Sequence, residues 1–175
     1  LKGKTLGVIG YGRLGKFLAR YADAFEMNVL AYDIDASKYD QYCNDVSLND
    51  LYSRADIISL HVKLNSDNHN MIGTEEISKF KPGTILVNTS RGELVDSNAI
   101  LKGFEDGNIS SVGLDVLPHE YAGTKLPNDP LIHEAKKNKR IIITPHIGGS
   151  TMEAHNIVFD VTKNLISNYL ENSND

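Results

Sequence analysis

The chain has 175 residues, which suits one domain with at most a small appendage. Hydrophobic residues make up 41% of it and charged residues 23%, as is typical of a globular protein. The formal net charge of −5 argues against nucleic acid as the main partner, because phosphate binding needs a basic face. No apolar run approaches the roughly 20 residues of a membrane-spanning helix, which argues against a membrane protein.

Short apolar runs alternate with helical stretches along the chain. The expected strands are Thr5–Ile9, Asn28–Tyr32, 55–60, 84–87, 110–116 and Ile141–Ile143. The expected helices are 13–25, Leu48–Arg54, 74–80, Ser97–Glu105 and 152–170. Such alternation indicates βαβ units and a mainly parallel sheet covered on both faces. Because these crossovers are right-handed, the sequence predicts an α/β fold with a doubly wound sheet in three α/β/α layers.

Two of the helices carry additional signals. The helix at 13–25 is predicted by apolar residues at three- and four-residue steps, which are Leu14, Phe17, Leu18, Tyr21 and Ala22. The helix at 74–80 is expected to begin with Thr74 as its cap, followed by acids in the first turn.

The stretch 118–139 is the least regular part of the sequence. It contains Pro118, Pro127 and Pro130, and it ends in a basic cluster at 136–140. We expect a long loop with a short helix at 131–137. For the basic cluster, a solvated helix end is favoured over a surface that steers phosphate groups.

A glycine motif, Gly10-Tyr11-Gly12-Arg13-Leu14-Gly15, follows the first expected strand and opens the next helix. Gly10 allows a tight turn, Gly12 leaves room for a pyrophosphate, and Gly15 lets the helix pack close to the strand. The N–H groups at the start of that helix then face the phosphates. This context predicts a dinucleotide-binding domain of the Rossmann type.

An acid at the end of the second strand completes this fingerprint. Asp33 lies 23 positions after Gly10 and directly follows Asn28–Tyr32, whereas Asp35 lies beyond the strand end. Its carboxylate is suited to accept hydrogen bonds from the adenosine ribose, and it repels a 2′-phosphate. The sequence therefore predicts NAD rather than NADP. The alternative is a glycine turn with an unrelated surface aspartate.

Three later segments place polar residues directly after expected strands, where open α/β sheets bind ligands. They are 88–92 (Asn-Thr-Ser-Arg-Gly), 113–120 (Gly-Leu-Asp-Val-Leu-Pro-His-Glu) and 144–150 (Thr-Pro-His-Ile-Gly-Gly-Ser). Together with the glycine motif, the start at Leu1-Lys2-Gly3-Lys4-Thr5 and Leu60-His61-Val62, these segments resemble the nucleotide-binding domain of the D-isomer-specific 2-hydroxyacid dehydrogenases. The resemblance covers nearly the whole chain. Within that family, the segment from Pro145 to Thr151 resembles the phosphoglycerate dehydrogenases.

The resemblance implies a hydride transfer between NAD(H) and a D-2-hydroxy acid or 2-oxo acid. It implies His146 as the proton donor and acceptor, Glu120 as its partner and Arg91 as the group that binds the substrate carboxylate. These three are the candidate catalytic residues, although each alone could be an ordinary surface or capping residue. The implied cofactor-binding residues are Gly10, Gly12, Arg13, Leu14, Gly15, Asp33, His61, Thr89, Ser90, Arg91, Asp115, His146, Gly148 and Gly149.

Two residues depart from the family pattern. Tyr121 replaces the proline that is common after the glutamate, and Lys63 stands where proline is also common. Neither removes a chemical group, so they bear on loop geometry rather than on the reaction class. The remaining histidines, His69, His119, His133 and His155, are expected on the surface, and no cluster has the spacing of metal ligands.

We expect residues 1–150 to form the NAD-binding domain and 151–175 to form a helix that returns towards an absent substrate domain. The chain begins with Leu1 rather than Met, so we expect an excised domain that binds NAD but turns over poorly. The family implies a homodimer, and the single Cys43 is compatible with the cytoplasm.

Alternatives stay open for both the predicted reaction class and the predicted substrate. An NAD(H)-sensing interaction protein of the corepressor type resembles the same family, and an adenosylhomocysteine hydrolase is a weaker alternative. The substrate expected first is 3-phosphoglycerate; glycerate or hydroxypyruvate, glyoxylate and D-lactate stay open.

Overall fold

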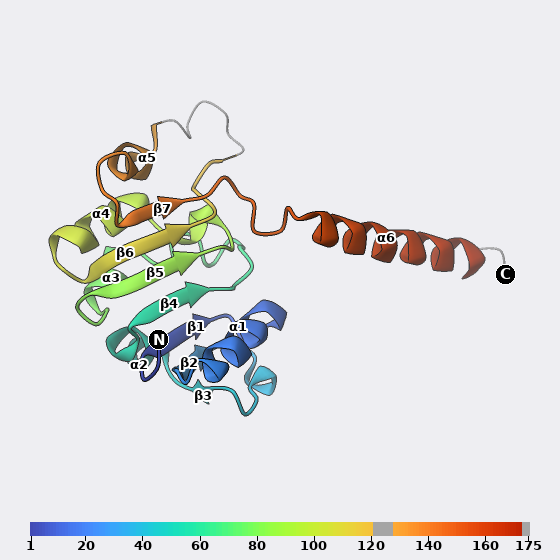
Figure 1. Ribbon diagram of the computed structural model, residues 1–175, viewed down its shortest axis with the longest axis horizontal. Coiled ribbons are helices and arrows are strands. Elements are labelled where there is room, and N and C mark those ends of the chain that lie inside the picture. The colour runs from blue at the N-terminus through green and yellow to red at the C-terminus, as the bar shows by residue number, and fades with distance from the viewer. Residues whose placement is uncertain (121–127, 173–175) are drawn as a thin grey trace. The chain divides into compact units, whose positions relative to one another are not determined.

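The computed structural model describes residues 1–120 and 128–172 and divides the chain into two compact units. The first is Leu1–Thr144 and contains the sheet (Figure 1). The second is Pro145–Asp175 and contains one long helix, α6 (Met152–Asn172). Tyr121 and Pro127 lie outside the described residues.

The first unit is built on a seven-stranded sheet in which every neighbouring pair is parallel. Its strands are β1 (Thr5–Ile9), β2 (Asn28–Tyr32), β3 (Asn44–Asp45), β4 (Ile57–Leu60), β5 (Thr84–Asn88), β6 (Ile109–Leu114) and β7 (Ile141–Ile143). Their order across the sheet is β3-β2-β1-β4-β5-β6-β7. The order reverses on either side of β1, as in a doubly wound sheet, so the predicted fold class is confirmed.

Helices pack on both faces of this sheet. They are α1 (Arg13–Ala24), α2 (Leu48–Arg54), α3 (Thr74–Ser78), α4 (Ser97–Glu105) and α5 (Pro130–Ala135), with short 3-10 turns η1 (Ala36–Lys38) and η2 (Gly92–Leu94). Alternate residues of β1 divide between the faces: Val8 joins the apolar cluster under α1, and Ile9 joins the larger cluster under α2, α3, α4 and α5. On the α1 side, Ile85 of β5 and Ile142 of β7 remain exposed, so this face is covered only in part by the described residues of the first unit.

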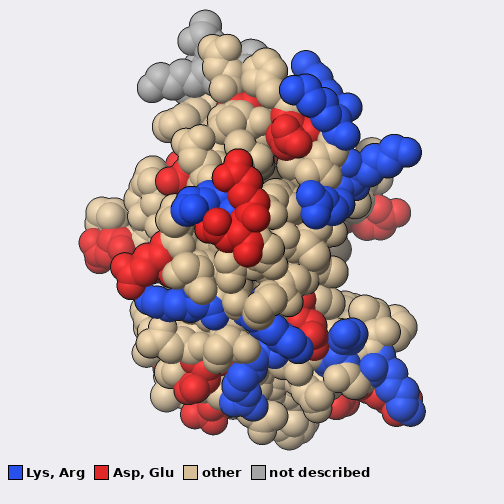
Figure 2. Space-filling model, turned by 90° about the vertical axis from the view of Figure 1, so that its left-hand side faces the viewer, with Lys and Arg blue, Asp and Glu red and all other residues tan. Residues whose placement is uncertain are grey.

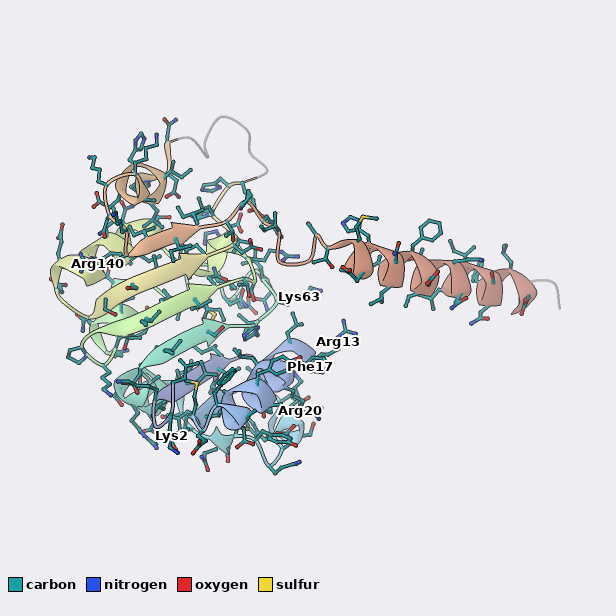
Figure 3. All side chains as sticks on the ribbon, in the orientation of Figure 1. Lys2, Arg13, Phe17, Arg20, Lys63 and Arg140 are labelled. Carbon is teal, nitrogen blue, oxygen red and sulfur yellow. The ribbon has the colours of Figure 1, made fainter. Side chains whose placement is uncertain are left out.

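Helix α1 buries small residues and exposes large ones. Gly15, Ala19 and Ala22 are the buried positions, which allows a close approach to the sheet. The large apolar residues of the predicted stripe are largely exposed, namely Leu14 at 66%, Phe17 at 48% and Tyr21 at 64%. Phe17 projects from the helix in Figure 3. The periodicity predicted the helix correctly, but only part of the apolar stripe faces the sheet.

The expected cap of one helix was wrong, and one short strand was missed. The cap of α3 is Gly73 rather than Thr74, because the Glu76 side chain accepts a hydrogen bond from the Gly73 N–H at 3.0 Å. The two-residue strand β3 was not predicted, since Asn44 and Asp45 are polar and exposed and carry no apolar pattern.

The charged surface is mixed. On the face shown in Figure 2, acidic and basic side chains are interspersed. In the basic cluster at 136–140, the charged residues are exposed, as expected for a solvated helix end, and Arg140 lies 4.9 Å from the centre of the Phe104 ring. None of the described helices is both long and apolar enough to span a membrane.

Candidate functional site

The glycine motif forms a tight turn between β1 and α1. Gly10 has φ +95°, and a Cβ placed on it would lie 2.7 Å from the backbone carbonyl carbon of His61. A Cβ on Gly15 would lie 2.3 Å from the carbonyl oxygen of Gly10, whereas one on Gly12 would meet nothing within 4 Å. The turn therefore needs glycine at two positions for its own packing and leaves open space at the third, at the N-cap of α1. Open space and free helix N–H groups are what a pyrophosphate requires.

Asp33 sits at the end of β2 and is held by the turn. Its Oδ2 accepts a hydrogen bond from the Tyr11 N–H at 2.7 Å, and its Oδ1 accepts one from the Asp35 N–H at 2.9 Å. Lys38 donates to the same Oδ1 at 2.9 Å. Burial tends to raise the pKa of Asp33, but these hydrogen bonds outweigh it and lower the pKa, so the group is a carboxylate at neutral pH.

A cavity of about 620 Å³ joins the turn to the end of β2. Its lining includes Gly10, Gly12, Asp33, Lys38, His61 and Lys63. The residues predicted to bind the pyrophosphate and the adenosine ribose thus meet in one hollow. Its size lies within the range of small-molecule and cofactor pockets, and its chemistry fits the adenosine half of a dinucleotide.

His61 is a half-buried ionisable group in this cavity lining. Its Nε2 lies 3.0 Å from Ser59 Oγ, and among the described residues no hydrogen-bond partner is present for its Nδ1. Burial lowers the pKa of His61, so the ring is neutral at pH 7. An unpartnered buried nitrogen beside the cavity is suited to a polar group of a ligand.

The segment after β5 is fixed by its own hydrogen bonds. Asn88 is buried; its amide donates to the Arg91 carbonyl at 2.8 Å, and its Oδ1 accepts from the Ser90 N–H at 3.0 Å. Ser90 Oγ donates to the Leu60 carbonyl at 2.8 Å, which ties the turn to β4. Thr89 and Arg91 are exposed at this edge of the sheet. The turn is therefore rigid, while these two side chains are accessible.

The segment after β6 packs directly on that turn. A Cβ on Gly92 would lie 2.0 Å from the Leu117 carbonyl carbon, so the two backbones touch and only glycine fits. Glu93 also accepts a hydrogen bond from the His119 N–H at 3.3 Å. Two of the three predicted polar segments, 88–92 and 113–120, therefore meet at the carboxyl edge of the sheet. Gly92 ends the predicted segment 88–92, but its packing contact was not predicted. The contact of Glu93 was not predicted either, since one glycine or one acid in a loop carries no recognisable signal.

The predicted residues of the β6 segment are partly enclosed. Asp115 is 7% exposed, its N–H donates to the Asn88 carbonyl at 3.0 Å, and its carboxylate accepts a hydrogen bond from Thr144 Oγ1. Glu120 is half-buried. The start of the third polar segment, Thr144, thus joins the other two within the first unit.

The remaining predicted residues lie in the second unit. His146 is half-buried and has φ +53°, a left-handed conformation that is uncommon for a non-glycine residue. Gly148 and Gly149 follow it and are exposed.

The histidines to which no role was assigned, His69, His119, His133 and His155, are exposed, as expected. Among the described residues, no three His, Cys, Asp or Glu side chains gather in the way that metal ligands would.

Comparisons with known proteins agree with this geometry. Residues 1–148 match the family model described as D-isomer specific 2-hydroxyacid dehydrogenase, NAD binding domain. The chain is 39% identical over 171 residues to a glyoxylate reductase of Thermococcus litoralis, covering 95% of this chain and 49% of the relative. It is 39% identical over 167 residues to D-3-phosphoglycerate dehydrogenase of Escherichia coli, covering 94% and 40%.

The fold is shared with solved structures of the same group. A D-lactate dehydrogenase from Aquifex aeolicus, solved with NAD and lactic acid, superposes with a TM-score of 0.84 at 35% identity, covering 97% of this chain and 54% of that one. The chain thus spans about half the length of the proteins it resembles. It belongs to the D-isomer-specific 2-hydroxyacid dehydrogenase family, of which it is the NAD-binding domain.

Proposed function

We propose that a protein carrying this domain transfers a hydride between NAD(H) and a D-2-hydroxy acid or its 2-oxo acid. The observation that carries the proposal is the contact between the segments after β5 and β6, at the same carboxyl edge as the glycine turn. In a parallel sheet this edge is where cofactor and substrate groups meet.

We assign the cofactor contacts along that edge. The N–H groups at the start of α1, those of Arg13, Leu14 and Gly15, are assigned to the pyrophosphate. Asp33 is assigned to the adenosine ribose and His61 to the adenosine end. The nicotinamide end is assigned to Thr89, Ser90, Asp115, Gly148 and Gly149. The supporting observations are the shared cavity and the fixed positions of Ser90 and Asp115.

The chemistry assigned to the chain's own residues is proton transfer and carboxylate binding. Bound NADH supplies a hydride. Arg91 binds the carboxylate of the 2-oxo acid through its fork of donors and is accessible for this. His146 gives a proton to the carbonyl oxygen as negative charge grows there, and takes it back in the reverse direction. By the family resemblance, we assign Glu120 the role of partner to His146.

The substrate that we propose first is a 3-phosphoglycerate-like acid. Similarity to D-3-phosphoglycerate dehydrogenase of Escherichia coli supports it. Glycerate or hydroxypyruvate, glyoxylate and D-lactate remain candidates, since relatives named for glyoxylate and glycerate match with similar identity.

Exposed apolar surface supports two further parts of the proposal. Large residues on α1, among them Phe17 and Tyr21, suit a homodimer contact, and on α6 Ile157, Val161 and Leu165 suit packing against a substrate domain.

We place the boundary of the NAD-binding domain near residue 150. We also propose a cytoplasmic location, which is supported only by the single, unpaired Cys43.

The test is NADH oxidation followed by absorbance, with the longer protein and four substrates: 3-phosphohydroxypyruvate, hydroxypyruvate, glyoxylate and pyruvate. Turnover with one of them that drops at least about 100-fold in Arg91→Ala and in His146→Ala supports the proposal. Tight NADH binding without turnover of any oxo acid would favour the NAD(H)-sensing alternative instead.

A further inference from the structure

A lysine occupies the position next to the ribose-binding carboxylate. Lys38 Nζ lies 2.9 Å from Asp33 Oδ1, and both residues line the 620 Å³ cavity. The two side chains differ in exposure: 38% for Lys38 and 8% for Asp33. The lysine is therefore the accessible member of the pair.

The local chain geometry brings Lys38 back to Asp33. Asp35 caps the turn η1, accepting from the Ser37 N–H at 3.1 Å and from Ser37 Oγ at 2.6 Å. The turn reverses the chain within five residues of Asp33. The ammonium group thus lies at the carboxylate to which we assign the ribose.

Asp33 does not need the lysine to keep its place. Its two backbone donors, the N–H groups of Tyr11 and Asp35, hold both carboxylate oxygens. Because these backbone donors stay in place and Lys38 is 38% exposed, the lysine can exchange partners without leaving Asp33 unpaired. A ligand with a strong anion beside Asp33 would gain such a partner.

The charge at the ribose end decides between the two forms of the dinucleotide. A lone carboxylate accepts from the 2′-OH of NAD and repels a 2′-phosphate, whereas a nearby cation accommodates the phosphate. Here both groups are present. Lys38 offsets the charge of Asp33 in the free protein, and its Nζ also lies 4.0 Å from Asp35 Oδ2. It offers a point charge to a phosphate.

Resting on the proposed binding of adenosine in this cavity, we propose that the site also accepts the 2′-phosphorylated dinucleotide NADP(H). Lys38 is the residue that binds the 2′-phosphate and thereby sets the discrimination between the two cofactors. NAD(H) remains a ligand because Asp33 is retained.

The test is calorimetric titration of the chain with ADP-ribose and with 2′-phospho-ADP-ribose, which differ only at the 2′ position. Wild type should bind the two with dissociation constants within about tenfold of each other. In Lys38→Met the ratio should widen by about tenfold or more, because a charge-assisted contact to phosphate is lost. Binding of the phosphorylated probe should also weaken with added salt.

Lys79→Met is the matched control. Lys79 forms an ion pair of 2.8 Å with Glu75, is 39% exposed and is not among the residues that line the cavity. It should leave the ratio unchanged. An unchanged ratio in Lys38→Met, or a wild type that binds ADP-ribose but not the phosphorylated probe, would overturn the inference. A wild type that binds neither probe would instead refute the proposed cofactor site.

Discussion

Gly15 of the glycine motif is required by the close packing of α1 against β1. Because a Cβ there would lie 2.3 Å from the Gly10 carbonyl oxygen and 3.1 Å from Val8 Cγ1, α1 has to move away from β1 to accept any side chain. We expect Gly15→Ala to lower the free energy of unfolding by about 1–3 kcal/mol, the usual cost of overpacking. Urea denaturation measures this, with Gly12→Ala as control because space there is open. Equal stability of Gly15→Ala and wild type would contradict the packing argument.

His61 should make the free energy of unfolding depend on pH, in a direction that its lowered pKa fixes. Burial lowers its pKa in the folded chain, whereas the unfolded value is about 6.5. The unfolded chain therefore binds more protons below that pH, and the free energy of unfolding should fall as the pH drops from 7 towards the lowered pKa. Carboxylates such as Asp33, whose pKa is lowered in the folded chain, change the free energy of unfolding mainly below about pH 5.

The check is urea denaturation between pH 7 and 5. His61→Gln should flatten the pH dependence in this window, and His133→Gln, at an exposed position, should leave it as in wild type. Parallel curves for wild type and His61→Gln would show that His61 does not carry the effect.

At the residue scale, the sequence predicted positions where backbone geometry dictates the residue. The places of the three glycines in the turn and of Asp33 at the end of β2 were predictable, because strand, turn and helix fix their spacing. Their roles in cofactor binding stay a prediction. The Lys38–Asp33 ion pair was not, since it depends on how η1 reverses the chain. The close contact at Gly92 was missed for a similar reason: its partner, Leu117, is distant in sequence.

Among the elements, α5 is linked to α4 by the side chain of one aspartate. Asp129 caps α5 by accepting from the Leu131 N–H at 2.8 Å, and its other oxygen accepts from Ser97 Oγ of α4 at 2.9 Å. Asp129→Ala removes both contacts, so we expect a loss of about 1–2 kcal/mol in the free energy of unfolding. Ser97→Ala should cost less, since the cap remains. Chemical denaturation compares them, and a larger loss in Ser97→Ala would contradict this assignment.

The exposed face of α1 gives a prediction about assembly. If Phe17 and Tyr21 lie in a homodimer contact, Phe17→Glu should lower the sedimentation coefficient from the value of a dimer to that of a monomer. The reason is that the dimer would have to bury the new charge. Ile34→Glu, at a 93% exposed apolar position outside α1, should sediment as wild type. A monomeric wild type, or a dimeric Phe17→Glu, would remove α1 from the interface.

Element prediction was accurate where apolar periodicity was strong and failed where polar contacts decide. β1, β2, β7, α2 and α4 have the expected bounds. The cap of α3 depends on the reach of the Glu76 side chain, and β3 is held by backbone pairing with Leu30 and Ala31 rather than by an apolar pattern. Contacts of this kind leave no periodic signal.

For the whole molecule, we propose that cofactor binding belongs to this domain and that turnover needs a second domain. The chain spans about half the length of its relatives and exposes apolar residues on α1, on the sheet and on α6. We therefore expect the 175-residue chain to bind NADH but to oxidise it with 2-oxo acids far more slowly than the longer protein, because closure of a second domain excludes water. Stopped-flow absorbance compares the two, and equal rates would contradict this expectation.

The central claim, that the glycine turn and its cavity hold the cofactor, is tested most directly by calorimetric titration of the chain with NADH in wild type and in Gly12→Ala. The open space at Gly12 predicts that wild type binds NADH and that the added methyl group weakens binding by about tenfold or more, while the free energy of unfolding changes by about 1 kcal/mol or less. A folded wild type that does not bind NADH, or a Gly12→Ala variant that binds it equally well, would contradict the account.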